Sequence, residues 1–144
     1  MVTVEGIATK ERSIVEKGIL KQYFVDNYYG KKMGMEPNGG STSNLIFSIG
    51  NQSLDDLIQS NDKGILVTGF NGGNSNSTTG DFSFGVSGFL FENGKLSKPI
   101  NEMNISGNAK TFWKQLIALG NDSYLFSATQ VPSLVFEGIS FSGL

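Results

Sequence analysis

The side chains in this sequence that could do chemistry are carboxylates, hydroxyls, lysines and tyrosines, because the chain contains no histidine and no cysteine. It therefore lacks the commonest ligands of zinc, the commonest general base of enzymes and any thiol nucleophile. Four aspartates could offer oxygens to a hard cation, but they lack the short, regular spacing of a calcium-binding loop: Asp55, Asp56, Asp81 and Asp122. We expect no metal site and no catalytic residue in this chain.

Asp81 and Asp122 leave one catalytic alternative open, a hydrolase that uses two carboxylates. Such an enzyme needs its carboxylates at a defined separation, and nothing in the sequence positions this pair. Asp122 follows Gly120 and Asn121, and all three residue types favour turns. The sequence therefore favours a turn-shaping role for Asp122.

The polar segment 71–80, followed by Asp81, is the main candidate for a binding site. It contains no apolar side chain and so cannot build a core. It also lacks the Gly-x-x-x-x-Gly-Lys-Ser/Thr pattern of a phosphate-binding loop. Long ordered loops often carry function, whereas others are only flexible connections. Both interpretations remain open at this point.

Charge and hydropathy exclude other classes of function. The net charge is -2, and the 11 Lys and Arg residues are scattered apart from the pair Lys31 and Lys32. This gives no basic surface for nucleic acid. The N-terminal residues lack the pattern of a secretion signal, and no stretch approaches the ~20 apolar residues that span a bilayer. We expect a cytoplasmic chain with neither a nucleic-acid nor a membrane partner.

Short strands separated by turns account for most of the sequence. It has 19 glycines and many Val, Ile, Thr and Phe residues, which are typical of strands and turns. Hairpin turns are predicted at residues 16–18 and at Asn93-Gly94, because Gly and Asn tolerate left-handed dihedral angles. The predicted strands cover residues 13–25 on both sides of the first turn, 45–49, 64–70, 81–91, 95–105, 123–127 and 134–141.

Three short helices are predicted from capping residues and apolar spacing. The first would begin after Asp26 and end at Gly34. The second would begin at Ser53, where Asp56 completes a capping box. The third would cover residues 108–119, which have large apolar side chains at helical spacing.

These elements predict one domain over residues 1–144. Its fold class is α+β and β-rich, with a mainly antiparallel sheet, bent or barrel-like, and two or three short helices. Alternation places Phe82 and Phe84 on one face of their strand, which we expect to point inward. For most of the other aromatic side chains, core packing is favoured over a binding platform: Tyr23, Phe24, Tyr28, Tyr29, Phe89 and Phe91.

Several segments, in order along the chain, resemble the C-terminal portion of the TldD/PmbA family. They cover essentially the whole sequence: residues 18–20, 29–34, 40–44, 64–68, 79–83, 88–94, 99–108 and 131–143. The resemblance implies a cytoplasmic, dimeric protein that trims or degrades peptides. The family is also associated with modulation of DNA gyrase, but the acidic balance of this chain does not support a DNA partner.

Within the family, this chain resembles the PmbA-like members more than the TldD-like members. TldD-like members are similar to zinc metallopeptidases, with a His-Glu-x-x-x-His helix upstream of the portion seen here and a cysteine ligand in the C-terminal portion. PmbA-like members lack these ligands. Here residues 123–132 contain no Cys-Gly-Lys stretch. The resemblance implies that this chain is non-catalytic by itself, that zinc belongs to a partner subunit, and that the partner is a TldD-like subunit or a second copy of this chain.

The resemblance also implies that the polar segment and its neighbours line a peptide channel. The residues expected to contact peptide are Asn71, Gly72, Gly73, Asn74, Thr79, Gly80, Asp81, Phe82 and Ser83. Extended peptides often bind by adding a strand to a free sheet edge. The alternative is a free-standing β-rich module that binds glycans or a surface, which the aromatic residues and the Asn/Gly/Ser segment suggest.

Overall fold

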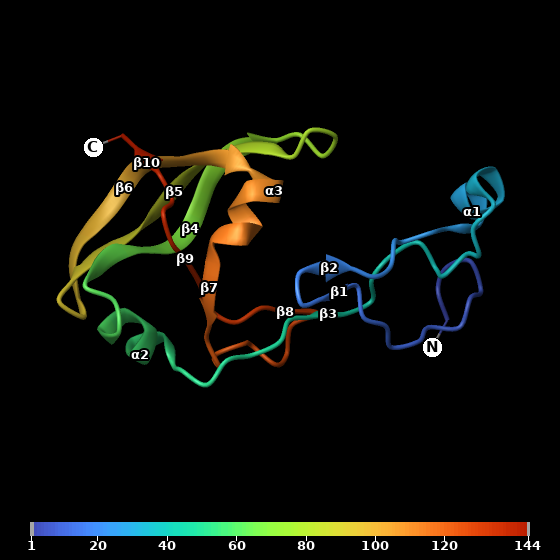
Figure 1. The fold of residues 1–144 in the computed structure, drawn as a ribbon, viewed down its shortest axis with the longest axis horizontal. Helices are drawn as coiled ribbons and strands as arrows, with labels where there is room; N and C mark the ends of the chain where they lie inside the picture. The colour runs from blue at the N-terminus through green and yellow to red at the C-terminus, as the bar shows by residue number, and fades with distance from the viewer. Residues whose placement is uncertain (1, 144) are drawn as a thin grey trace. The chain divides into compact units, whose positions relative to one another are not determined.

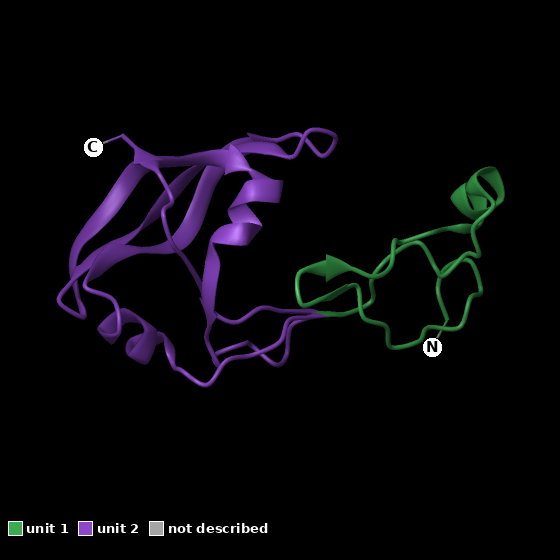
Figure 2. Cartoon of the chain, in the orientation of Figure 1, with its two compact units in different colours: residues 1–45 green, residues 46–144 purple. Residues whose placement is uncertain are grey.

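The computed structural model describes residues 2–143 and divides into two compact units, Met1–Leu45 and Ile46–Leu144 (Figure 2). Each unit is described by itself. The expectation of a single domain over residues 1–144 stays a prediction.

Hydrogen bonds rather than a core organise the first unit. The hairpin of β1 (Val15–Glu16) and β2 (Ile19–Leu20) turns at Lys17 and Gly18, whose φ angles are 49° and 77°. Helix α1 (Asn27–Met33) begins where the Asp26 carboxylate accepts a hydrogen bond from the Tyr29 amide (2.7 Å), and it ends at left-handed Gly34. The predicted hairpin and helix are confirmed.

Val25 is the buried apolar side chain of this unit, with 4% of its surface exposed. Its amide donates to the Asn38 side chain (3.0 Å), and its carbonyl accepts hydrogen bonds from the amides of Asn38 and Gly40 (2.8 and 3.2 Å). The Arg12 guanidinium donates to the carbonyls of Asn38 and Ser41. These bonds tie Arg12 and Val25 to the segment 38–41.

A four-stranded antiparallel sheet forms the second unit, with strand order β10-β6-β5-β4 (Figure 1). Its strands are β4 (Lys63–Ser75), β5 (Asp81–Glu92), β6 (Lys95–Asn108) and β10 (Phe141–Ser142). The β5–β6 turn is the predicted Asn93-Gly94, with φ angles of 51° and 71°. Shifts in register interrupt both long pairings, as expected of bulges that bend a sheet.

The core of the second unit lies on one face of this sheet. Val86, Ile100, Met103 and Ile105 are buried together, and Phe82 and Phe84 pack against them, so the prediction that these two rings share an inward face is confirmed. Helix α2 (Leu54–Gln59) buries Leu57 and Ile58. It begins with the predicted capping box, in which Ser53 and Asp56 each accept a hydrogen bond from the other's amide.

Short elements complete the unit. Strand β3 (Leu45–Ile46) pairs with β8 (Thr129–Gln130), and β7 (Leu116–Leu119) pairs with β9 (Leu134–Phe136). Helix α3 (Ala109–Phe112) follows β6 and continues into one 3-10 turn, Trp113–Gln115. The predicted class is confirmed: a β-rich α+β fold with three short α-helices. Over residues 2–143 the sheet is bent and open, not a closed barrel.

The helix predicted over residues 108–119 is wrong beyond Gln115, where the 3-10 turn ends and β7 begins. Leu116, Ala118 and Leu119 pair with Phe136, Val135 and Leu134 instead. Their apolar side chains suit a buried strand as well as a helix, and a partner strand fifteen or more residues away decides between the two.

Other boundaries also differ from the prediction. Residues 71–75 are not loop but the end of β4, the strand predicted over 45–49 shortens to Leu45–Ile46, and residues 123–127 form turns instead of a strand. Core packing is wrong for Tyr23, Phe24, Tyr28, Tyr29 and Phe89, which are exposed. The first four lie in the first unit, which has little apolar surface on which to bury them.

Candidate functional site

The structure brings the nine predicted peptide-contacting residues to one end of the sheet. They lie on the tip of the β4–β5 hairpin, where Gly73, Asn74 and Ser75 pair with Phe84, Ser83 and Phe82. Gly73 has φ 138°, and an added Cβ would lie 2.4 Å from the Phe84 ring, so only glycine fits there. Segment 71–83 is therefore a shaped hairpin end rather than a free loop.

The turn itself is closed by its own hydrogen bonds. The Asn76 side-chain oxygen accepts from the amides of Thr78 and Thr79 (2.9 and 3.2 Å). The Asn76 carbonyl accepts from the Gly80 amide (2.7 Å), and the Asn76 amide donates to the Asp81 carbonyl (2.8 Å). An Asn that bonds the following amides in this way stabilises a turn. This pattern favours an ordered tip over a flexible connection.

Asp81 is the charged group of this site. Its carboxylate accepts hydrogen bonds from the Asn108 amide group (2.8 Å) and the Thr79 hydroxyl (2.7 Å). These two bonds lower the pKa of Asp81, and the bond from Asn108 has the larger effect. They do so because they stabilise the charged form. Asp81 is therefore ionised at neutral pH and is a fixed hydrogen-bond acceptor, which suits positioning better than proton transfer.

Asn108 is the site residue that the sequence did not single out. It pairs with Asp81 across β5 and β6, donates to the Thr79 carbonyl (2.9 Å), and caps α3 by accepting from the Lys110 amide (3.0 Å). An Asn directly before a helix is a capping signal, but its partners at Thr79 and Asp81 depend on the strand register. That register was not readable from the sequence.

Asp122 belongs to a different arrangement. Its carboxylate accepts hydrogen bonds from the amide and hydroxyl of Ser133 (2.7 and 2.6 Å). Partial burial raises the pKa of Asp122, but the bonds from Ser133 outweigh it, so that the net shift is downward. Asp81 and Asp122 share no partner, and the arrangement gives no support for a two-carboxylate hydrolase.

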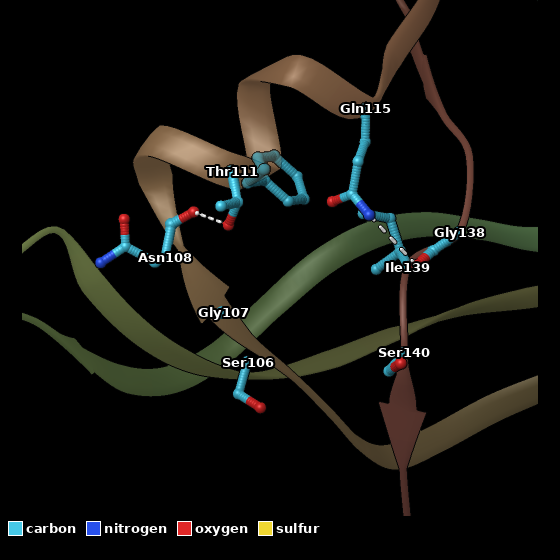
Figure 3. Close-up of a pocket in the computed structure, with 9 residues that line it drawn as sticks. Ser106, Gly107, Asn108, Thr111, Gln115, Gly138, Ile139 and Ser140 are labelled. Atoms are coloured by element: carbon cyan, nitrogen blue, oxygen red, sulfur yellow. Dashed lines mark hydrogen bonds between the residues drawn. The ribbon is translucent and has the colours of Figure 1, made fainter.

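A pocket of about 180 Å³ adjoins Asn108 (Figure 3). Its lining comes from the end of β6, from α3 with the following turn, and from the segment before β10: Ser106, Gly107, Asn108, Thr111, Phe112, Gln115, Gly138, Ile139 and Ser140. The Gln115 amide group donates to the Gly138 carbonyl (3.2 Å) and ties two of these segments together. No charged side chain lines the pocket.

Zinc does not fit the residues present. Among residues 2–143 no three His, Cys, Asp or Glu side chains are grouped so that they could hold a metal ion, and the full sequence supplies no imidazole or thiolate. The carboxylates of Asp56, Asp81 and Asp122 are each engaged by hydroxyl, amide or backbone donors. No catalytic step through zinc can be derived from these side chains.

Over the described residues, no helix combines the length and apolar character that a membrane span requires.

Comparison with known proteins gives a family for the whole chain. Residues 1–143 match the PmbA/TldA metallopeptidase C-terminal domain. The chain is 36% identical over 143 residues to a metalloprotease PmbA homolog of Buchnera aphidicola subsp. Baizongia pistaciae, and 37% identical over 142 residues to that of Haemophilus influenzae. These matches cover 97% and 96% of the chain but only 32% of each relative. The chain thus spans about a third of their length.

A solved structure agrees with this assignment. A Bacteroides thetaiotaomicron protein, described as a candidate modulator of DNA gyrase, superposes with a TM-score of 0.96 at 57% sequence identity. The match covers 99% of this chain and 33% of the other.

Proposed function

The chain belongs to the PmbA/TldD metallopeptidase family, and from that premise we propose that it is the C-terminal domain of a PmbA-like subunit in a cytoplasmic peptidase complex. In this proposal it holds no metal. It supports a zinc-bearing, TldD-like partner subunit and contributes to the surface along which peptide lies.

The absence of zinc donors in a member of a metallopeptidase family is the single observation that carries the proposal. The match extends over residues 1–143, yet the chain has neither His nor Cys, and residues 2–143 hold no acidic cluster in their place. The chain spans about a third of its relatives' length, and within this portion the resemblance implies a cysteine ligand in TldD-like members. The lack of that ligand here supports the proposal that the metal is held by the partner subunit.

The hairpin end supports the second part of the proposal. An unfolded peptide exposes backbone N–H and C=O groups, and these are the groups that a sheet edge can pair. Strand β4 lies at the edge of the sheet, and its end carries uncharged polar residues beside the fixed carboxylate of Asp81. We infer that this end contacts the peptide backbone through Asn71, Gly72, Gly73, Asn74, Thr79, Gly80, Asp81, Phe82 and Ser83.

Cleavage of an unfolded peptide tests the proposal. The chain, a TldD-like protein from the same organism and an equimolar mixture of the two are incubated with a fluorogenic peptide that has no stable fold. We expect no cleavage by the chain alone and faster cleavage by the mixture than by the TldD-like protein alone. Cleavage by the chain alone would contradict the metal-free role, and a mixture no faster than the TldD-like protein would contradict the supporting role.

A variant at the hairpin end separates peptide contact from subunit contact. Asp81→Ala removes the carboxylate that Asn108 and Thr79 hold, and Asp55→Ala removes an exposed carboxylate on α2 as a matched control. We expect the Asp81 variant to raise the KM of the mixture for peptide, while the Asp55 variant leaves KM unchanged. Equal KM values for both variants would place peptide binding away from this hairpin.

A further inference from the structure

Three Asn-Gly pairs occur in the chain, at residues 38–39, 71–72 and 93–94. Asparagine is a thermolabile residue, because the backbone nitrogen of the next residue can attack its side-chain carbonyl carbon. A following glycine favours this attack, since it has no Cβ to hinder the approach and its backbone reaches more conformations. All three pairs have this glycine, so the fold must decide which of them reacts fastest.

The structure holds the first pair in place. The Asn38 side-chain amide group donates to the Tyr23 carbonyl (2.8 Å), and the Asn38 side-chain oxygen accepts a hydrogen bond from the Val25 amide (3.0 Å). Gly39 is buried. Both bonds must break before the Asn38 side chain can turn toward the nitrogen of Gly39, so the fold protects this pair.

The third pair is held by its turn. Asn93 and Gly94 lie between Glu92 and Lys95, which pair with each other across β5 and β6. The Asn93 amide donates to the Asp62 carbonyl (2.6 Å), and Gly94 lies against α2. The Asn93 side chain is exposed, but the backbone that would carry out the attack is fixed on both sides.

The second pair is held least. Asn71 and Gly72 lie in the bulge between Phe70 and Gly73, and within the described sheet neither has a register partner on β5. Both residues are exposed, and among residues 2–143 the Asn71 side chain makes no hydrogen bond. Because β4 ends the strand order, β5 is the one strand of the described sheet that restrains this bulge. Asn71 is therefore the freest to react.

We propose that Asn71 is a site of spontaneous deamidation. The Gly72 nitrogen attacks Cγ of Asn71, a new N–Cγ bond forms and the Cγ–Nδ2 bond breaks, so that ammonia leaves with the proton of the Gly72 amide. Water then opens the resulting cyclic imide at one of its two C–N bonds and gives aspartate or isoaspartate. Either product places a negative charge within residues 64–80, which carry none in the unmodified chain.

The reaction changes the hairpin end in charge and in shape. A carboxylate at residue 71 repels acidic peptides, so the modified chain discriminates against them. Isoaspartate also lengthens the main chain by one carbon, next to Gly73, where an added Cβ would already meet the Phe84 ring. The effect on peptide rests on the proposed function, whereas the deamidation itself does not.

Mass-spectrometric mapping of the aged chain tests the proposal. The purified chain is kept at body temperature in neutral and in mildly alkaline buffer, and the mass gain of deamidation is followed at all three pairs in the same sample. Fragmentation separates Asn71 from Asn74 and Asn76. We expect Asn71 to convert first, and faster in alkaline buffer because the attacking nitrogen must lose its proton. Asn38 should convert about tenfold more slowly, since its two hydrogen bonds must break.

The chain unfolded in urea is the control, and there Asn38 and Asn71 should convert at similar rates. Equal rates at Asn38 and Asn71 in the folded chain would overturn the site, and so would a rate difference that persists in urea. In Asn71→Gln the mass gain at residue 71 should disappear, because glutamine would have to close a larger ring; a mass gain that remains there also counts against the site.

Asn71→Asp tests the effect on peptide separately. In the cleavage assay of the mixture, we expect this variant to raise the KM for an acidic peptide and to leave the KM for a neutral peptide unchanged. Equal KM values for the variant and the wild type would remove residue 71 from the peptide-contacting surface and leave the deamidation standing. The comparison of the mixture with the TldD-like protein alone still decides the supporting role independently.

Discussion

The two compact units are built in different ways. Six of the seven buried apolar side chains in residues 2–143 lie in the second unit, four of them clustered on the sheet and two on α2, and the first unit has only Val25. The first unit is instead held by caps, tight turns and side-chain bonds to backbone groups, such as those of Asp26, Asn38 and Arg12. Net hydrogen bonding contributes less than burial, so the difference predicts two separate levels of stability.

The largest effect is expected in the core of the second unit. Met103 is 3% exposed, and Met103→Ala should lower the free energy of unfolding by roughly 2–5 kcal/mol, as large-to-small core substitutions do. This loss is measured by unfolding in urea, monitored by the fluorescence of Trp113, the one tryptophan of the chain. Met33→Ala, at 63% exposure in the first unit, is the matched control and should change stability by less than about 0.5 kcal/mol. Equal losses would remove the distinction between the units.

The next effect concerns the single buried side chain of the first unit. Val25→Ala removes two buried methyl groups and should cost roughly 2 kcal/mol of local stability. Hydrogen exchange of the Asn38 and Gly40 amides, which donate to the Val25 carbonyl, should accelerate, while the Trp113 transition stays in place. A shift of that transition by the same amount would mean that the two units unfold together.

A smaller effect is expected at the bond between Asp122 and Ser133. Asp122→Ala removes both hydrogen bonds that join residue 122 to residue 133, next to the β7–β9 pairing, and should cost about 1 kcal/mol. If this pair acts as one unit, Ser133→Ala combined with Asp122→Ala costs little more than Asp122→Ala alone. Fully additive losses in urea unfolding would show that the bonds contribute separately.

The smallest effect is the acid sensitivity of the second unit. Asp56, Asp81 and Asp122 all have a lowered pKa in the folded chain. A carboxyl group whose pKa is lower in the folded chain than in the unfolded chain stabilises the fold. This contribution is fully present above the pKa in the unfolded chain, about 3.9, and is lost as the pH falls through the pKa in the folded chain. The Trp113 transition should therefore weaken below about pH 4. The triple Asp→Asn variant should lose less stability from pH 5 to pH 3 than the wild type, and an equal loss would contradict these assignments.

Local signals were the part of the fold that could be read from the sequence. The caps at Asp26 and Ser53 and the turn at Asn93-Gly94 were predicted correctly, because each depends on residues within a few positions of one another. The helix predicted beyond Gln115 was wrong, because residues 116–119 pair with β9 instead. Long-range pairing overrides local helical spacing in such a segment.

In the candidate site, too, features set by neighbouring residues were predicted and features set by distant residues were missed. Segment 71–80 was identified because its polar composition cannot form a core. The strand character of residues 71–75 was missed, since an edge strand facing solvent carries no apolar alternation. Asn108 was missed because its partners, Thr79 and Asp81, lie 29 and 27 residues away. The bulge at Asn71 and Gly72 also depends on the pairing of β4 with β5.

Zinc content tests the account's central claim most directly. The chain, a TldD-like protein from the same organism and their purified mixture are each equilibrated with zinc, dialysed and measured by mass spectrometry of the metal. The account predicts far less than one zinc per molecule of this chain alone, and one zinc per TldD-like subunit whether or not this chain is present. Stoichiometric zinc retained by this chain, which has no His and no Cys, would contradict it.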